Sequence, residues 1–236
     1  MTASALRGTS HRATRPVSPY ETAKRATDVV VSAAALVVAA PIGAAIAWRV
    51  HREDRGPVIF RGLRVGRGGR TFHILKFRTM TVGADQLGLH VTPGDDPSLT
   101  GAGRFLRRWK LDELPQLVNV LLGDMSLVGP RPPTVWDADH YDDEQRHLLD
   151  VRPGITDWAS IRYRNQDTMI EGRADPHAAY FDLIRPGKMD LALAYLRHRS
   201  YAVDLGILGL TALALVHYPR TDELLQRMVT SVRARV

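Results

Sequence analysis

The sequence contains no cysteine. Disulfide bonds, cysteine nucleophiles and thiolate metal sites are therefore excluded, and the absence fits a reducing, cytoplasmic environment. Zinc-finger, KH and RRM signatures are also lacking, so only bulk charge favours a nucleic-acid partner. The glycine-rich stretch at 66–69 lacks the Gly-Lys-Ser/Thr ending of a P-loop. No internal repeat or second domain is evident.

The charge of the chain predicts an anionic partner. Its 236 residues suffice for one domain with a sizeable core, and the net charge of +7 suits an acidic membrane surface, phosphorylated substrates or nucleic acid. Residues 1–20 are rich in Ser, Thr, Arg and Pro without an apolar period, so we predict a disordered basic tail there. This tail lacks the apolar region of a signal peptide.

A membrane-associated helix is predicted next. The segment 29–47 has no charged residue and is long enough to cross a bilayer. Basic residues flank both of its ends, so the positive-inside rule assigns both ends to the cytoplasm. Pro41 interrupts the helix near its middle. These features alone fit equally well a re-entrant helix over 21–50 that is kinked at Pro41 and a Pro-kinked transmembrane helix.

Two strands are predicted at 57–65 and 70–80, joined by the glycine-rich turn at 66–69. Alternation along the second strand places Lys76 and Arg78 on the same face. Taken alone, such a pair more often consists of solvated surface charges than of ligands.

An adjacent acid pair, Asp112 and Glu113, precedes a short predicted helix that has an apolar stripe and ends at Gly123. Pro115 falls in the first turn of this helix, so the acids lie at the positive end of its dipole. Seen alone, the pair is more often a helix cap, and Arg131, between two prolines, would fit an internal salt bridge. The combination of acids and several cations in one short stretch favours the handling of phosphate and metal.

At these residues a family resemblance becomes specific. Residues 111–132, L-D-E-L-P-Q-L-V-N-V-L-L-G-D-M-S-L-V-G-P-R-P, resemble the signature of the bacterial sugar transferases, which are monotopic polyprenyl-phosphate phosphoglycosyl transferases. The similarity extends over about 24–211. It implies an α+β fold with one re-entrant helix broken at Pro41, a small sheet and surrounding amphipathic helices. The catalytic domain, 51–236, would then lie at the cytoplasmic face of the inner membrane.

The resemblance also implies an activity. Members of this family move a phosphosugar from a UDP-sugar to polyprenol phosphate, release UMP, and thereby begin the assembly of a polysaccharide or glycoconjugate. It implies Mg²⁺ as cofactor, membrane lipid as a partner and no nucleic acid, and an oligomer is compatible with it. Composition alone leaves open a non-catalytic basic membrane scaffold and a nucleic-acid binder.

The same resemblance implies roles for individual residues. Asp112 would attack the β-phosphorus to form an acyl phosphate and would also bind the metal. Glu113 would orient or deprotonate the polyprenol phosphate, or help to hold the metal. The implied phosphate- and substrate-binding residues are Lys76, Arg78, Arg107, Arg131, Arg152 and Thr156.

Three positions depart from the family pattern. Ser98 replaces an expected arginine, which puts the role of that arginine in nucleotide binding in doubt. Asp157 and Ser160 replace a glycine and a glutamine in the segment that begins at Arg152. Because this segment resembles part of the substrate pocket, the sugar preference is expected to differ from that of commoner members.

Three further helical segments are expected in the second half of the chain. Residues 135–149 predict a polar helix with a solvated acidic face. Residues 205–216 are apolar but too short to span a bilayer, which fits either core or a helix at the membrane interface. Residues 221–236 combine an apolar stripe with arginines, as expected of a helix resting on anionic lipid.

Overall fold

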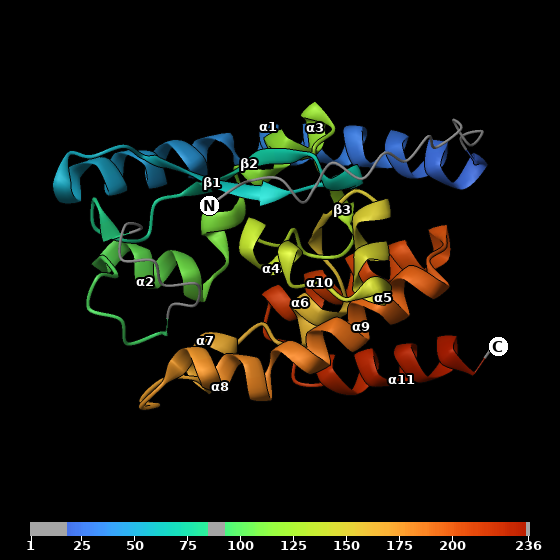
Figure 1. Ribbon diagram of the computed structural model, residues 1–236. Coiled ribbons are helices and arrows are strands. Elements are labelled where there is room, and N and C mark those ends of the chain that lie inside the picture. The colour runs from blue at the N-terminus through green and yellow to red at the C-terminus, as the bar shows by residue number, and fades with distance from the viewer. Residues whose placement is uncertain (1–17, 85–92, 235–236) are drawn as a thin grey trace.

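The computed structural model of the chain describes residues 18–84 and 93–234. In chain order its elements, where η marks a 3-10 turn, are α1 (Pro19–Asp54), β1 (Ile59–Val65), η1 (Arg67–Gly69), β2 (Thr71–Phe77), α2 (Gly101–Arg108), η3 (Leu111–Glu113), α3 (Gln116–Leu122), β3 (Ser126–Val128), α4 (Val135–Asp139), α5 (Asp143–Arg146), η4 (His147–Asp150), β4 (Gly154–Thr156), α6 (Trp158–Arg162), α7 (Gln166–Met169), α8 (Pro176–Leu183), α9 (Arg185–His198), α10 (Tyr201–Leu215) and α11 (Thr221–Arg233). Helix α1 lies along one side of the molecule, and α8 and α11 lie along the opposite side (Figure 1).

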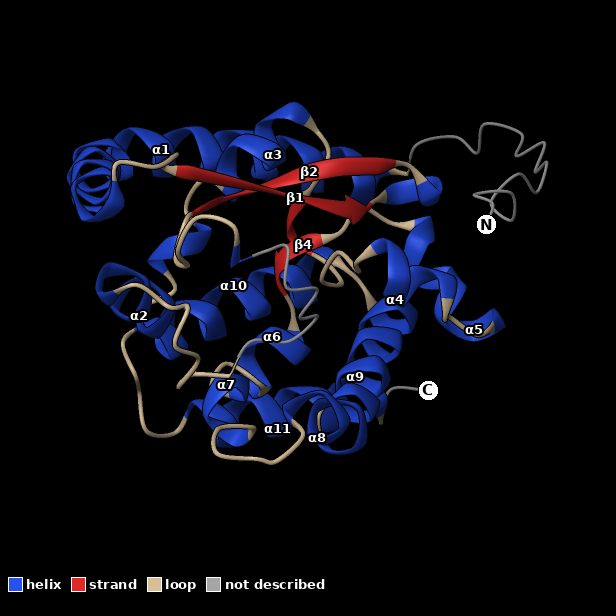
Figure 2. Cartoon of the chain, turned by 60° about the vertical axis from the view of Figure 1, so that its left-hand side comes forward, coloured by secondary structure: helices blue, strands red, loops and turns tan. Residues whose placement is uncertain are grey.

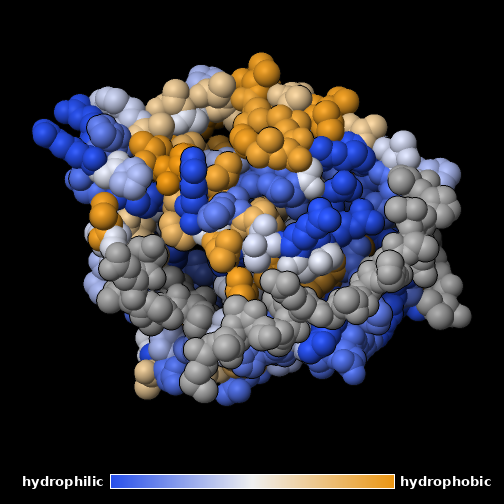
Figure 3. All heavy atoms as spheres, turned by 45° about the horizontal axis from the view of Figure 1, so that its top comes forward, coloured by the Kyte–Doolittle hydropathy of each residue, from blue (hydrophilic) through white to orange (hydrophobic). Residues whose placement is uncertain are grey.

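Helix α1 begins where Ser18 caps it, since the N–H of Glu21 donates to Ser18 Oγ over 3.2 Å. It is long and apolar enough to cross a membrane, and only 11% of its most apolar stretch is buried within the protein. Hydrophobic side chains gather on the side of the molecule that carries α1 (Figure 3), and they include Val37 and Val38, which are 76% and 74% exposed. The helix is therefore suited to membrane association.

Pro41 lies inside α1, which continues as one helix from Pro19 to Asp54. The re-entrant course predicted from Pro41 is not resolved by this arrangement and stays a prediction. The predicted tail, 1–20, lies outside the described residues except for its last three, of which two belong to the first turn of α1.

The predicted hairpin is confirmed. Strands β1 and β2 pair antiparallel with Ile59 opposite Phe77 and Val65 opposite Thr71, and they lie beside α1 and α3 (Figure 2). Strands β3 and β4 form a separate parallel pair. The two small sheets together with the helices confirm a mixed fold of helices and strands.

Asn119 joins α3 to the hairpin. Its Nδ2 donates to the carbonyl of His73, and the N–H of Leu75 donates to its Oδ1, both over 2.9 Å. Both polar groups of the carboxamide therefore hydrogen-bond to the backbone of β2, on the edge of the strand that does not pair with β1. This contact fixes the short helix, and the turn before it, against the strand that carries Lys76.

The main core is built around Trp158 and Tyr195, whose rings meet edge to face with centroids 6.1 Å apart. Buried side chains from α3, β3, α6, α9, α10 and α11 surround them. A second cluster joins the C-terminal half of α1 to Phe77 of β2 and Leu106 of α2. Burial of these apolar surfaces holds the helices around the two sheets.

The structure corrects one prediction about the C-terminal helix. The apolar stripe of α11 packs into the main core, where Leu225, Val229 and Val232 are all buried. Helix α11 also lies on the side of the molecule opposite α1 (Figures 1 and 2). The expectation that this stripe rests on lipid is therefore wrong, because the stripe is packed against the core of the protein. Helix α10 is divided, with Ile207 buried and Leu205 48% exposed.

The single polar helix predicted at 135–149 is also wrong. The segment forms α4, α5 and η4: α4 starts at a cap just ahead of the segment, and a second helix start is capped inside it. Thr134 Oγ1 accepts from the N–H of Asp137 over 3.0 Å, and Asp142 Oδ1 accepts from the N–H of Gln145 over 2.8 Å.

The tight contact between α2 and the segment after β2 gives a stability prediction. A Cβ at Gly103 would lie 1.9 Å from the carbonyl oxygen of Thr79, whereas a Cβ at Gly209 would meet nothing within 4 Å. Gly103→Ala should lower the free energy of unfolding by about 1–3 kcal/mol. Gly209→Ala, a helical control, should raise it by roughly 0.5–1 kcal/mol. Thermal unfolding in detergent measures both, and equal stability of the two variants would contradict the close approach.

Candidate active site

A cavity of about 1200 Å³ opens between the hairpin β1–β2, the turn η3, the loop at 130–134 and helices α6, α8 and α9. Six of its lining residues were candidates in the sequence analysis: Lys76, Arg78, Arg107, Asp112, Glu113 and Arg131. Charged residues that are far apart in the sequence therefore line the same cavity.

The acid pair lies in η3, directly ahead of α3, with Pro115 at the N-cap of that helix. Lys110 precedes the turn in the left-handed conformation, with φ 55° and ψ 22°. This conformation is uncommon for a residue with a side chain and costs on the order of 1 kcal/mol, so the surrounding packing must enforce it. The prediction that the acids stand just before the helix is confirmed.

Glu113 is held between two cations. Lys76 Nζ lies 2.8 Å from its Oε1, and Arg131 donates to both carboxylate oxygens, from Nη2 over 2.6 Å and from Nη1 over 3.4 Å. Burial would raise the pKa of Glu113, but Arg131 and Lys76 together hold it well below its ordinary range. Glu113 is therefore ionised at neutral pH.

Asp112 has a different environment. Its carboxylate is buried, and burial raises its pKa even though Lys76, with Nζ 3.7 Å from Oδ2, acts in the opposite direction. Its Oδ1 is buried without a hydrogen-bond partner within the described part of the chain. An oxygen in this state is an unused acceptor beside the cavity, so Asp112 is the acid of the pair that is left open to a ligand or a reacting group.

The unused oxygen also fits a divalent cation. Hard oxygen donors suit Mg²⁺, which commonly takes one or two carboxylates and completes its shell with phosphate and water. Across residues 18–84 and 93–234, no three His, Asp or Glu side chains are grouped so as to hold a metal. A metal at Asp112 would therefore depend on substrate oxygens for most of its ligands.

The remaining cations of this wall have their own partners. Arg107 donates from Nε to Thr79 Oγ1 over 3.1 Å. Arg78 forms a bidentate pair with Asp54 at the C-terminal end of α1, with Nη1 2.7 Å from Oδ2. Arg78 thus lines the cavity but is anchored to the membrane-associated helix rather than to the acid pair.

Two predicted site residues lie apart from the cavity. Arg152 donates from Nε to the carbonyl of Gly123 over 3.0 Å, at the end of α3, where a cation complements the helix dipole. The hydroxyl of Thr156 lies 2.7 Å from that of Thr211 on α10. Neither residue lines the cavity. Their contacts join elements of the fold, so the structure separates them from the other candidates.

Two of the departures from the family pattern do line the cavity. Asp157 caps α6 by accepting from the N–H of Ser160 over 2.6 Å, and both residues belong to the wall. Sequence reasoning missed Lys188 of α9, which also lines the cavity and bonds to Gln166. Burial and the nearby charge of Arg131 lower the pKa of Lys188 to about 8.

The chain is similar to known proteins over most of its length. The family model described as bacterial sugar transferase matches residues 19–218. Among the relatives, the galactosyl transferase CpsE of Streptococcus agalactiae serotype III (strain NEM316) is 41% identical over 62% of this chain and 35% of its own length. The UDP-glucose:undecaprenyl-phosphate glucose-1-phosphate transferase of Escherichia coli (strain K12) is 36% identical over 80% of this chain and 39% of its own length.

The chain thus spans little more than a third of the length of these two relatives. It matches a shorter relative more completely. The uncharacterized sugar transferase EpsL of Bacillus subtilis (strain 168) is 39% identical over 69% of this chain and 71% of its own length. The extent of the family match and the identity of these relatives lead to one conclusion. The chain belongs to the bacterial sugar transferase family.

Proposed function

We propose that the protein transfers a phosphosugar from a UDP-sugar to a polyprenol phosphate at a membrane surface, releases UMP, and so begins the assembly of a polysaccharide or glycoconjugate. The observation that carries the proposal is the buried, unpartnered Oδ1 of Asp112 in a cavity walled by Lys76, Arg107 and Arg131. Relatives whose names give undecaprenyl phosphate as the acceptor support this choice.

In the first step, a carboxylate oxygen of Asp112 attacks the β-phosphorus of the donor. A bond forms between this oxygen and phosphorus, and the bond from phosphorus to the bridging oxygen breaks, so that UMP leaves with the electron pair. The product is an aspartyl phosphosugar. Burial favours the attack, because a poorly solvated carboxylate has fewer water contacts to lose.

In the second step, a phosphate oxygen of the polyprenol phosphate attacks the phosphorus of the aspartyl phosphosugar. The acyl phosphate bond breaks, Asp112 is restored as a carboxylate, and the polyprenyl-diphosphate-linked sugar is released. Glu113, ionised beside its two cations, would orient the incoming phosphate through the shared side chains of Lys76 and Arg131.

The cations and Mg²⁺ would offset the charge of the reacting phosphates. Lys76, Arg107 and Arg131 line the same wall, and the planar guanidinium groups suit bidentate contact with phosphate oxygens. Asp112 would hold Mg²⁺, which would stabilise negative charge on the diphosphate.

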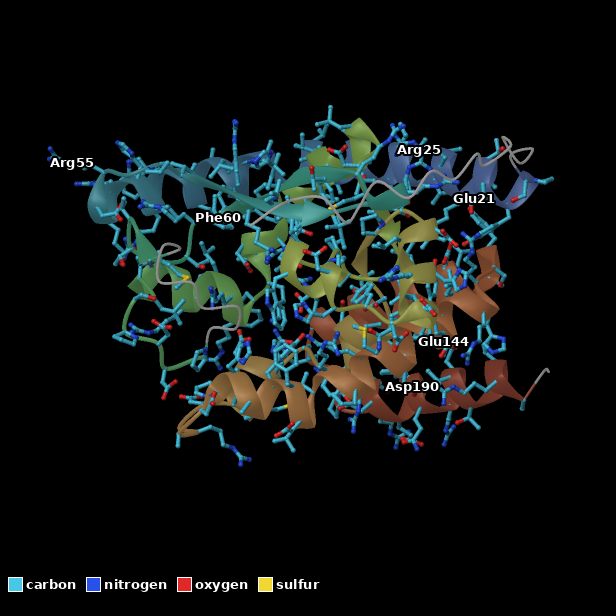
Figure 4. All side chains as sticks on the ribbon, viewed as in Figure 1. Glu21, Arg25, Arg55, Phe60, Glu144 and Asp190 are labelled. Carbon is cyan, nitrogen blue, oxygen red and sulfur yellow. The ribbon has the colours of Figure 1, made fainter. Side chains whose placement is uncertain are left out.

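The site would lie at the cytoplasmic face of the inner membrane. Helix α1 carries the charged residues Glu21 and Arg25 near one end, and Arg55 follows its other end (Figure 4). Basic residues at both ends favour keeping both on the cytoplasmic side, which a helix that enters the bilayer, kinks at Pro41 and returns would satisfy. The long lipid phosphate would then reach the cavity from the membrane surface.

The central test follows the covalent intermediate. Protein is incubated with a panel of UDP-sugars and Mg²⁺, without polyprenol phosphate, and intact mass is measured. Wild type should gain one phosphosugar, while Asp112→Asn should gain none, because the amide cannot form an acyl phosphate. Glu113→Gln should still form the adduct but turn over at least about 100-fold more slowly with undecaprenyl phosphate.

Three results would contradict this assignment. An adduct on Asp112→Asn, or one that maps to Glu113, would remove Asp112 as the nucleophile. A first half-reaction that strictly requires polyprenol phosphate would favour direct transfer. If Asp112→Asn released UMP at the wild-type rate, the carboxylate of Asp112 would not be catalytic, and the role of the acid pair would be structural.

A second prediction concerns the guanidinium of Arg131. Arg131→Lys keeps the charge but loses the planar fork that reaches both oxygens of Glu113, so kcat/KM for UMP release should fall roughly 10- to 100-fold with the fold retained. Arg227→Lys is the matched control, because Arg227 forms an exposed pair with Glu223 far along the chain. Equal activity of the two variants would make Arg131 peripheral to the reaction.

A third prediction concerns the course of α1. Reporter tags at both termini should be accessible only from the cytoplasm. Pro41→Leu should straighten the helix and move part of the population to a crossing form with one terminus outside. Ala40→Leu adds similar hydrophobicity next to Pro41 and keeps the proline, so it should leave the topology unchanged. An external N-terminus in wild type would rule out the re-entrant course.

A further inference from the structure

Asp157 is a buried acid, and its second carboxylate oxygen has no hydrogen-bond partner among the described residues. The residue is 1% exposed and lines the cavity. Its Oδ1 accepts from the N–H of Ser160 over 2.6 Å, while Oδ2 is buried with no hydrogen-bond partner in the described parts of the chain. A buried acceptor without a donor is costly, and such groups in native proteins usually have a partner that the protein alone does not show. A donor on a bound ligand would provide one.

The chemistry around Asp157 limits what this ligand group is. A carboxylate repels phosphate, so the diphosphate of a donor belongs on the cationic wall at Lys76 and Arg107 rather than here. Burial raises the pKa of Asp157, while Ser160, Arg131 and Lys188 act in the opposite direction. A polar pocket of this kind suits a neutral group that donates a hydrogen bond, as a hydroxyl does.

The position of Asp157 in the cavity of the acid pair indicates which part of the donor it would contact. Asp157 and Asp112 line the same cavity, and the charges of both, after that of Glu113, raise the pKa of Arg131. Asp157 therefore lies in the cavity that holds the carboxylate proposed to attack phosphorus. The sugar is bonded through oxygen to this phosphorus, whereas the ribose is separated from it by the second phosphate.

We infer that Asp157 binds a hydroxyl group of the transferred sugar through Oδ2 and thereby contributes to the choice of donor. This inference rests on the proposed function and adds a contact that selects among sugars. Lys188, which bonds to Gln166, lines the same cavity as Asp157. An apolar polyprenyl chain would not satisfy a buried carboxylate, so the acceptor is a poorer match for this position.

The test uses variants that keep the helix cap. Asp157→Asn retains a carbonyl oxygen for the N–H of Ser160, and Asp157→Ser retains a capping hydroxyl but has no atom at the place of Oδ2. Asp175→Asn is the matched control, because Asp175 caps α8 by accepting from the N–H of Ala178 over 2.9 Å and does not line the cavity. The full chain is assayed with Mg²⁺ and undecaprenyl phosphate by release of UMP.

The donors are the UDP-sugar with the highest kcat/KM for wild type and its monodeoxy analogues. For the parent donor, both Asp157 variants should lose roughly 10- to 100-fold in kcat/KM, the size expected for a hydrogen bond to a charged group. One deoxy analogue should lose a similar factor with wild type. With this analogue, wild type and the Asp157 variants should agree within about threefold, because the contact is absent in both. The inhibition constant of UDP, which has no sugar, should not change.

The outcomes distinguish a failure of the sugar contact from a failure of the proposed transferase function. A loss in the Asp157 variants that is equal for the parent donor and every deoxy analogue, or no loss at all, would overturn the sugar contact while UMP release by wild type upheld the transferase. Weaker inhibition by UDP in these variants would place Asp157 at the nucleotide instead. Failure of wild type to release UMP from any donor would overturn the proposed function, and the sugar contact with it.

Discussion

The ion pairs of Glu113 with Lys76 and Arg131 are the interaction on which the site depends. Each partner comes from a different part of the chain: Lys76 from β2, Glu113 from the turn η3, and Arg131 from the loop after β3. A buried carboxylate is stable only when its charge is paired, so these elements must meet for the site to form. Asn119 secures one of these meetings by holding α3, and the turn before it, on the backbone of β2.

The pairing also explains how two adjacent acids acquire different properties. Arg131 and Lys76 use the carboxylate of Glu113 almost completely, so its pKa is low and its geometry is fixed. Asp112 is instead buried, and Lys76 lies farther from it than from Glu113. One of its oxygens has no hydrogen-bond partner among the described residues. A sequence pattern of two acids has no such asymmetry, because the difference arises from which side chain the neighbouring strand and loop can reach.

Local features of the site could therefore be predicted from the residues themselves, whereas the grouping of Lys76, Arg107 and Arg131 with the acid pair was predicted only from the family resemblance. The hairpin and the turn before α3 follow from alternation and from proline and glycine positions, and both are confirmed. Arg152 was grouped with the site because its segment resembles a substrate loop, yet it caps the end of α3, a contact that depends on where two distant segments meet. The stripe of α11 likewise has the same period whether it faces lipid or core, and only the packing of Leu225 against the main cluster distinguishes them.

The charges that face Asp112 suggest why the cavity suits a diphosphate. Lys76, Arg107 and Arg131 line the same cavity as this carboxylate, and Lys76 Nζ lies 3.7 Å from its Oδ2. A diphosphate that bridges a sugar and a nucleoside is negatively charged, so side chains of opposite charge stand along the cavity. Because Arg131 is 40% exposed while its partner Glu113 is largely buried, Arg131 is the cation best placed to share its guanidinium with an arriving phosphate. The proposed phosphate binding and the ionisation of Glu113 would thus be coupled through one side chain, and a change at Arg131 would alter both together.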